Sequence, residues 1–217
     1  MVRKVVRQSL ADQAYALVID KTRRGELKSG ERINIEECAK EIGVSRTPMR
    51  EAINRLIQNG FLETKHNVGP SVAEYSKKEI TDLIATNAIL MEGVVNLFIK
   101  QPIGSDALDN LSKIVQEQEE AMEAEDTHIF YLKSMDFHYA LIELCPNERL
   151  KRYAKETQTQ IGIWVYQYQE DEKTRRESFG EHKMLAQLLR EGKTEEFIKV
   201  AKRHNERPLE YFEKREE

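Results

Sequence analysis

The sequence predicts a mostly α-helical protein in two parts: an N-terminal winged helix-turn-helix over residues 1–75 and a C-terminal antiparallel all-helical bundle over residues 76–217. Apolar residues recur at helical spacing through most of the chain, which is typical of amphipathic helices. Two short extended segments lie close together, at residues 61–65 and 70–73. Charge divides at the same boundary, because residues 1–75 hold 13 Lys and Arg against 10 Asp and Glu, whereas the rest holds 21 against 28. The basic first third therefore favours contact with a polyanion in that part of the chain.

The composition restricts the class of protein. The chain is 40% hydrophobic and 33% charged, which indicates an ordinary globular protein. No uncharged apolar run approaches the roughly 20 residues that a membrane-spanning helix needs. The first ten residues, MVRKVVRQSL, lack the apolar segment of a secretory signal. Cys38 and Cys145 are expected to be reduced thiols, so we predict a cytoplasmic protein with no membrane partner.

The first part of the chain divides into three helices and a hairpin. Residues 10–24 form an amphipathic stripe, with Ser9 as a suitable N-cap. A short helix over residues 35–42 precedes a Gly-Val turn. The third helix begins at Ser45, whose hydroxyl is expected to cap the first turn, and it ends near Asn59. Three helices followed by a small hairpin outline a winged helix-turn-helix.

The outward face of the third helix carries the chemistry of this part. Arg46, Arg50 and Asn54 follow one another at a spacing of four residues, so their side chains lie one above another. A DNA major groove admits a helix of this size, and arginine can bond two acceptors on one guanine edge. The alternative is a solvated charged face in which Glu51 pairs with Arg55. We favour DNA binding because the preceding helix, the turn and the hairpin all fall where docking to DNA needs them.

Four further residues complete the predicted DNA interface. Ser45 and Thr47 lie beside the start of the third helix, where hydroxyl groups and the helix dipole bind phosphate oxygens. His66 and Gly69 lie at the tip of the hairpin, from which they could reach the neighbouring minor groove or backbone.

The same segments resemble a known family. The runs GELKSG, AKEIGVSRTPMREAINRLIQNGFL and VGPSV resemble the GntR family of bacterial transcription regulators, for which VSRTPxREA is close to a signature. The resemblance implies that Arg46 and Arg50 contact base edges and phosphates, that Ser45 and Thr47 contact the backbone, and that Gly69 lies at the wing tip. One position departs from the pattern, because Glu36 stands where some relatives have a DNA-contacting arginine.

The second part of the chain shows six helical segments and no strand pattern. Ser76 and Glu79 fit a capping box at the start of the first. The others are expected at roughly residues 105–125, 127–144, 147–170, 174–190 and 194–214. Short connections between them predict an antiparallel bundle.

Three of the five histidines lie on apolar stripes of three different helices: His138, His182 and His204. A single inward histidine is usually a hydrogen-bonded core residue, but three on separate helices favour convergence on one polar centre. Imidazole nitrogens bind zinc, nickel, manganese or iron. The sequence therefore predicts a divalent transition-metal site, with a plain buried polar cluster as the alternative.

The C-terminal pattern also resembles the ligand-binding FCD domain of the FadR subgroup. The resemblance is carried by Phe137-His138, by Glu181-His182 and by a further histidine 22 residues later. It implies a metal held by three histidines and an aspartate one turn before the first, but that position is Ser134. Relatives tend to have an arginine for an acidic effector where this chain has Ala88. The expected effector residues are Asn87, Ser134, His138, His182 and His204.

These features together predict a DNA-binding transcriptional regulator that is not an enzyme. We expect a homodimeric repressor that binds an inverted-repeat operator and responds to a small metabolite, with an organic acid as one candidate. The rival interpretations are a metal-dependent enzyme built on the three histidines, and a regulator whose helical part only dimerises. The identity of the effector, the operator and the metal is not encoded in a readable motif.

Overall fold

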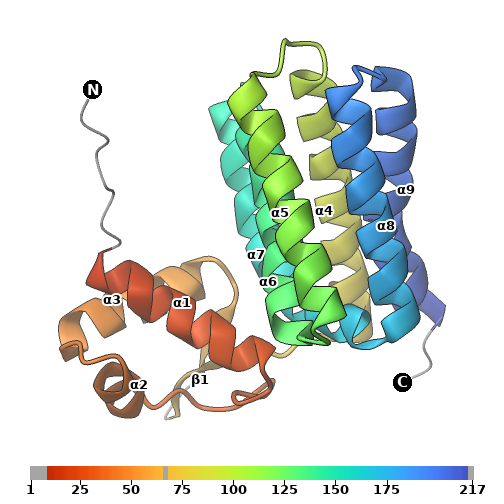
Figure 1. Cartoon of the computed structure of the whole chain (residues 1–217). Coiled ribbons are helices and arrows are strands. Elements are labelled where there is room, and N and C mark those ends of the chain that lie inside the picture. The colour runs from red at the N-terminus through yellow and green to blue at the C-terminus, as the bar shows by residue number, and fades with distance from the viewer. Residues whose placement is uncertain (1–8, 66–67, 215–217) are drawn as a thin grey trace, which may run out of the picture. The chain divides into compact units, whose positions relative to one another are not determined.

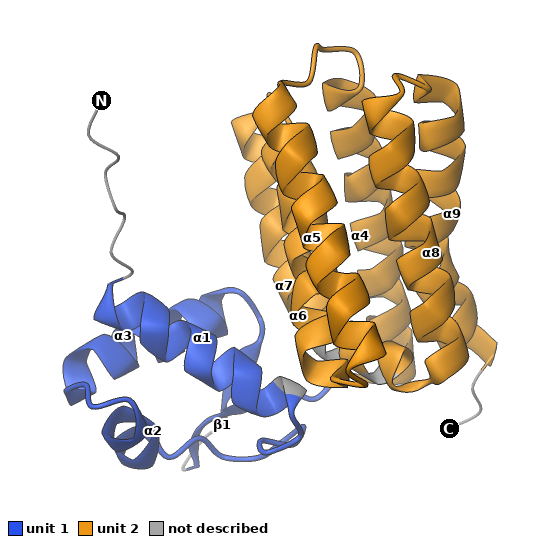
Figure 2. Cartoon of the chain, in the orientation of Figure 1, with its two compact units in different colours: residues 1–74 blue, residues 75–217 orange. Residues whose placement is uncertain are grey.

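The computed structural model describes residues 9–65 and 68–214. The chain divides into two compact units, residues 1–74 and residues 75–217 (Figure 2). The boundary lies within the short segment between the hairpin and the first long helix.

The first unit contains three helices and a two-stranded antiparallel sheet (Figure 1). In the sheet, Leu62 lies opposite Val72, and Lys65 lies opposite Gly69. An isolated bridge between Arg32 and Ser71 adds a further backbone contact to this wing. The elements are α1 (Leu10–Arg23), α2 (Ile35–Glu41), α3 (Arg46–Gln58), β1 (Leu62–Lys65) and β2 (Gly69–Val72).

Local sequence explains where these helices begin. Ser9 and Asp12 form a reciprocal capping box at the start of α1, which satisfies two backbone amides. Gly43 ends the turn after α2 with φ of +67°, a conformation that L-residues with a side chain rarely adopt. Ser45 is the N-cap residue of α3, but its side chain makes no capping hydrogen bond, so the expected hydroxyl cap is wrong.

The core of the first unit lies between α1 and α3. Met49, Ala52 and Leu56 on α3 are buried together with Ala14 and Val18 on α1. Each of these side chains removes apolar surface from water, which contributes about 1.5–3 kcal/mol for a large aliphatic residue. The inner face of α3 is therefore fixed by packing, and its outer face is left to solvent.

The second unit is an all-helical bundle (Figure 1). Helix α4 packs against α7 and α9, and α5 packs against α6 and α8. Ser76 and Glu79 form the predicted capping box at the start of α4. The six helices are α4 (Lys77–Phe98), α5 (Ser105–Glu123), α6 (Thr127–Glu143), α7 (Glu148–Glu170), α8 (Glu172–Arg190) and α9 (Thr194–Lys214).

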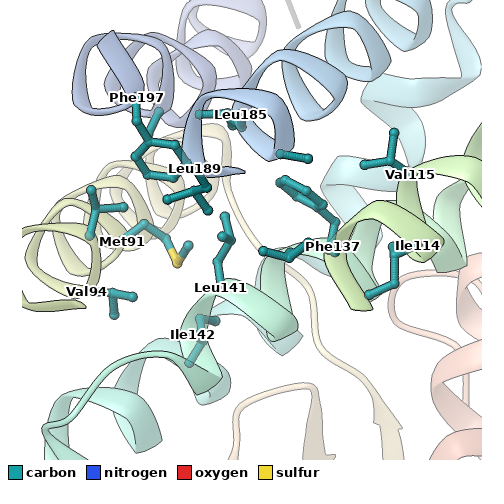
Figure 3. Close-up of a cluster of buried hydrophobic side chains, with 14 of the residues drawn as sticks. Met91, Val94, Ile114, Val115, Phe137, Leu141, Ile142, Leu185, Leu189 and Phe197 are labelled. Atoms are coloured by element: carbon teal, nitrogen blue, oxygen red, sulfur yellow. The ribbon is translucent and has the colours of Figure 1, made fainter. Parts of the chain in front are cut away.

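A large apolar cluster fills the interior of the bundle (Figure 3). Met91 and Val94 of α4 meet Leu141 of α6, Leu189 of α8 and Phe197 of α9. By length and composition alone, α4 could cross a membrane. In this fold it contributes buried side chains to the bundle core instead.

Candidate functional site

The first functional surface is the outer face of α3. Its members are all exposed, whereas Met49 and Ala52 on the opposite side of the helix are buried. The side chains on this face, which we call the recognition surface, are Ser45, Arg46, Thr47, Arg50 and Asn54.

A groove of about 470 Å³ runs beside the recognition surface and gathers three arginines. Arg46 and Arg50 reach it from α3, and Arg32 reaches it from the segment before α2. Glu36 lines the same groove, and its Oε1 lies 2.6 Å from a guanidinium nitrogen of Arg46. Sequence reasoning missed Arg32, although its position two residues after a glycine turn and before a helix could have marked it as exposed.

The structure supports the predicted position of Gly69 in the wing and gives Arg55, on α3, a structural role. Gly69 begins β2 with φ of +96°, which explains why glycine occupies this position of the wing. His66 lies outside the described residues. Arg55 pairs with Asp12 of α1 at 2.7 Å and stacks over the Tyr15 ring, so it does not form the pair with Glu51 that the alternative interpretation of this helix required.

The second site lies inside the bundle, where three imidazoles meet. The Nε2 atom of His204 lies 3.1 Å from Nε2 of His182 and 3.2 Å from Nε2 of His138. One ligand atom from each ring lies within 4.8 Å of the others. Two nitrogens that bind one ion at about 2.0–2.1 Å are themselves about 3 Å apart. The two His204 separations therefore fit a shared metal ion.

In His182 and His204, the Nδ1 atom, which points away from the other rings, has a hydrogen-bond partner on a neighbouring side chain. His182 Nδ1 lies 2.9 Å from Oε1 of Gln118, and His204 Nδ1 lies 2.9 Å from a carboxylate oxygen of Glu181. An oxygen partner accepts a proton from Nδ1, which leaves Nε2 with a lone pair. The Nε2 atoms of His182 and His204 lie 3.1 Å apart, and a cation bound by both rings would stabilise this close approach.

Ring packing and burial favour neutral imidazoles. The Phe137 ring stacks on His182 with centroids 4.3 Å apart, and His138 stacks on His204 at 5.0 Å. Burial and, to a lesser extent, electrostatic repulsion from His204 together lower the pKa of His138 from 6.5 to about 3. Burial likewise holds the pKa of His182 well below its ordinary value. Neutral imidazole is the form that binds a metal.

A cavity of about 30 Å³ adjoins the histidines, and its lining has no Lys, Arg, Asp or Glu among the described residues. Asn87 Oδ1 and Gln169 Oε1 are buried without a hydrogen-bond partner in the described part of the chain. The lining side chains are Ile84, Asn87, His138, Gln158, Ile161, Val165, Tyr168, Gln169, Ser178, His204, Asn205 and Pro208.

Ser134 takes the place where the resemblance implies an aspartate ligand. Its side chain is fully buried, and its Oγ accepts a hydrogen bond of 2.8 Å from Gln169 Nε2. Asp136 is exposed and pairs with Lys133, so it does not replace the missing carboxylate. The donor set fits a divalent transition metal held by three imidazoles, with the Ser134 hydroxyl and the Asn87 and Gln169 amides nearby.

All six helices of the bundle contribute to this region. Sequence reasoning found the histidines, Asn87 and Ser134 but missed the amides of Gln118, Gln158 and Gln169. Gln118 follows Ile114 and Val115 at helical spacing, so an amide on an apolar stripe was the available signal. We call the following side chains the polar centre: Asn87, Gln118, Ser134, His138, Gln158, Gln169, His182 and His204.

Comparison with known proteins matches both units to described families. Residues 10–72 match the model of bacterial regulatory proteins of the gntR family, and residues 82–207 match the FCD domain. The chain is 32% identical over 171 residues to the Nta operon transcriptional regulator of Aminobacter aminovorans, covering 78% of each protein. It is 26% identical over 157 residues to a probable D-xylose utilization operon transcriptional repressor of Paenarthrobacter nicotinovorans, covering 69% of this chain and 66% of that protein.

A solved structure has the same fold across nearly the whole chain. The E. coli protein McbR/YncC superposes with a TM-score of 0.82 at 19% identity, covering 95% of this chain and 98% of that one. The exposed arginine face on a winged helix-turn-helix, the bundle and the two family matches agree with one another. The chain belongs to the GntR family of DNA-binding transcriptional regulators, in the FadR-like group that carries an FCD domain, and it is not an enzyme.

Proposed function

We propose that this protein is a metal-assisted repressor of the bacterial cytoplasm that binds an inverted-repeat operator as a homodimer and responds to a small metabolite. The observation that carries the sensing part is the meeting of three imidazole Nε2 atoms: that of His204 lies 3.1 Å from that of His182 and 3.2 Å from that of His138. One of the relatives is described as a probable transcriptional repressor, which supports repression as the mode of regulation.

The recognition surface carries the DNA part of the proposal. Arg46 and Arg50 are exposed one turn apart, so both guanidiniums can enter one major groove with the amino-terminal half of α3. Ser45 and Thr47 bind phosphate oxygens beside the helix start, and Asn54 extends the contact by one turn. Gly69 allows the wing backbone to approach the duplex closely.

Two exposed apolar side chains on α4 and α7, which we call the apolar patch, support the homodimer. Ile89 of α4 is 70% exposed, and Tyr153 of α7 is 47% exposed. A Cβ at Gly93 would lie 3.4 Å from Leu150, so α4 and α7 are in close contact near both residues. A second copy that covers this patch would bury apolar surface and present two recognition helices to successive half-sites.

The cavity supports a mechanism in which the effector changes the bundle. A volume of about 30 Å³ holds one or two water molecules, since one ordered water needs roughly 10–15 Å³. A metabolite therefore binds only when the surrounding helices move, and a ligand that favours the moved state shifts the population of dimer geometries.

The polar centre indicates how an organic acid would be held. His138, His182 and His204 would bind the metal, and a bound divalent ion supplies the positive charge that the cavity lining lacks. The amides of Asn87 and Gln169, with the Ser134 hydroxyl, orient the ligand by hydrogen bonds. An acidic effector is thus expected to bind the metal-loaded protein and to bind the metal-free protein weakly.

Metal analysis joined to a ligand screen tests this proposal. The purified protein and His138→Ala are compared for bound zinc, nickel, manganese and iron. Each is then screened by thermal shift against organic acids and sugar acids, with and without added metal. We expect metal-dependent stabilisation by at least one acid in the wild type only, because a ligand of the native state raises Tm by mass action. Equal metal content in both proteins, or no metal in either, leaves a bundle that only dimerises.

A further inference from the structure

Glu181 links the polar centre to the surface of the bundle. One carboxylate oxygen lies 2.9 Å from Nδ1 of His204, and the side chains of Glu181 and His204 are only 12% and 9% exposed. The second carboxylate oxygen pairs with Arg207 of α9. Arg207 also pairs with Glu177, which lies one turn before Glu181 on α8. Glu181 therefore receives two charge-assisted contacts that fix its position.

The chemistry of this contact decides which nitrogen of His204 carries the proton. An ionised carboxylate has only acceptor oxygens, so the hydrogen in this bond must come from Nδ1 of His204. In a neutral imidazole, Nε2 then holds a lone pair, and this atom lies 3.1 and 3.2 Å from Nε2 of His182 and His138. His204 is the ring that stands close to both of the others.

The other two histidines are held less firmly. The partner of His182 Nδ1 is the Gln118 amide, which can present either its oxygen or its NH2 group to the ring. The Gln118 Nε2 atom has no hydrogen-bond partner within the described residues, so no hydrogen bond at this atom opposes such a turn. His138 Nδ1 is buried without a partner in the same part of the chain.

We infer that Glu181, held in place by Arg207, is the positioning residue that fixes His204 with its Nε2 lone pair directed at the other two imidazoles. Glu181 does not itself reach the place where the three Nε2 atoms meet. It acts through His204, and Arg207 acts through Glu181. The consequence for metal affinity rests on the proposed metal function, whereas the consequence for the His204 proton does not.

Four variants of the full chain test the inference. Glu181→Leu removes the acceptor, and Glu181→Gln keeps an acceptor oxygen but removes the charge. Arg207→Met leaves the carboxylate without its surface partner. Glu177→Leu is the matched control, because Glu177 contacts Arg207 on the same helix face and does not contact a histidine.

The first readout is the position of the imidazole proton in metal-free protein, measured by nitrogen-15 NMR of labelled histidine at neutral pH. We expect His204 to carry its proton on Nδ1 in the wild type, in Glu181→Gln and in Glu177→Leu. Glu181→Leu should shift the proton toward Nε2. If the leucine variant does not fold, Arg207→Met gives the same test with a partial shift.

The second readout is zinc affinity, measured by competition with a chromophoric chelator. Loss of an outer partner of a metal-binding histidine typically weakens affinity about 10–100-fold, and we expect this for Glu181→Leu. The zinc affinities of Glu181→Gln and Arg207→Met should lie between those of Glu181→Leu and the wild type. The affinity of Glu177→Leu should stay within about twofold of the wild-type value.

The outcomes separate the two proposals. A wild-type proton on Nε2 of His204, or a Glu181→Leu variant that keeps both the wild-type proton position and the wild-type zinc affinity, overturns the inference. A wild type that binds no zinc overturns the metal function, and the proton measurement then decides the role of Glu181 alone.

Discussion

The recognition surface and the polar centre place their functional side chains in opposite environments. Arg46 and Arg50 are exposed on the outside of a helix whose inner face is independently packed. His182 is fully buried, stacks on Phe137 and accepts its orientation from Gln118 on another helix. The charges on the recognition surface carry little free-energy cost because water solvates them, whereas burial in the polar centre favours uncharged, hydrogen-bonded groups.

This difference predicts how each site responds to change. Substitutions on the recognition surface should alter binding and leave stability nearly unchanged, because few core contacts depend on those side chains. Substitutions in the polar centre should alter stability and ligand binding together, since the same hydrogen bonds serve both. Three measurements test this contrast.

The largest effect is expected for Arg46→Ala and Arg50→Ala. Each should weaken binding to the operator by about 5- to 150-fold, because a bidentate base contact contributes about 1–3 kcal/mol. The free energy of unfolding should change by less than about 0.5 kcal/mol, since both side chains are exposed. Fluorescence anisotropy with a labelled promoter duplex and urea unfolding provide the two values.

Arg55→Ala is the control on the same helix. Arg55 pairs with Asp12 and stacks on Tyr15, so its loss should reduce stability by up to about 1 kcal/mol and affect operator binding less than the other two changes. If Arg55→Ala weakens DNA binding as strongly as Arg50→Ala, the division of α3 into a reading face and a structural face is wrong.

The next effect is the acid sensitivity of the metal-free bundle. Burial lowers the pKa of His138 to about 3 and that of His182 well below 6.5, so the unfolded chain takes up protons at higher pH than the folded chain. Their contribution to stability is complete above pH 6.5 and is lost as the pH falls from there toward 3. As the pH falls through this window, each histidine should lower the free energy of unfolding by up to about 1.4 kcal/mol per pH unit.

Urea unfolding of metal-free protein at several values between pH 7 and pH 5 measures this slope. The upper part of the window is diagnostic, because carboxylates titrate mainly below it. His182→Gln removes one buried imidazole and should flatten the slope. A free energy of unfolding that stays constant from pH 7 to pH 5 in the wild type would show that the buried rings do not control acid stability.

The contrast also explains what sequence reasoning could reach. The reading face follows from a spacing of four residues on one helix, the N-cap at Ser9 follows from its place before an apolar stripe, and the capping box at Ser76 follows from residues three apart. The inward direction of the three histidines follows from helical periodicity on each helix separately. Local order along the chain was sufficient for all of these features.

The missed features depend on contacts between distant segments. Gln118 is 64 residues from His182, and Glu181 is 23 residues from His204, so no local pattern pairs them. The same reason applies to Arg55, for which the alternative interpretation proposed the local partner Glu51, whereas the structure pairs it with Asp12, 43 positions away. Which helices become neighbours is decided by packing of the whole bundle, and this sets the partners of each polar group.

The smallest predicted effect concerns Glu36, which brings a negative charge to the recognition surface. Its carboxylate lies 2.6 Å from the Arg46 guanidinium, and both side chains are well exposed. Glu36→Gln should release Arg46 and remove repulsion with phosphates, which raises affinity for any duplex by about 1.5- to 5-fold at low salt. The gain should be similar for the operator and for a scrambled duplex of equal length, and it should shrink as salt is added.

The opposite result would assign Glu36 a different role. A carboxylate can accept a hydrogen bond from the amino group of cytosine, so Glu36 could read a base while it orients Arg46. In that case Glu36→Gln would weaken operator binding and leave the scrambled duplex unaffected. Anisotropy titrations with both duplexes at two salt concentrations distinguish these roles, and Glu37→Gln on the same first turn of α2 is the matched control for a change of charge alone. Operator binding that falls only in Glu36→Gln would mean that the recognition surface includes a residue of α2 as well as those of α3.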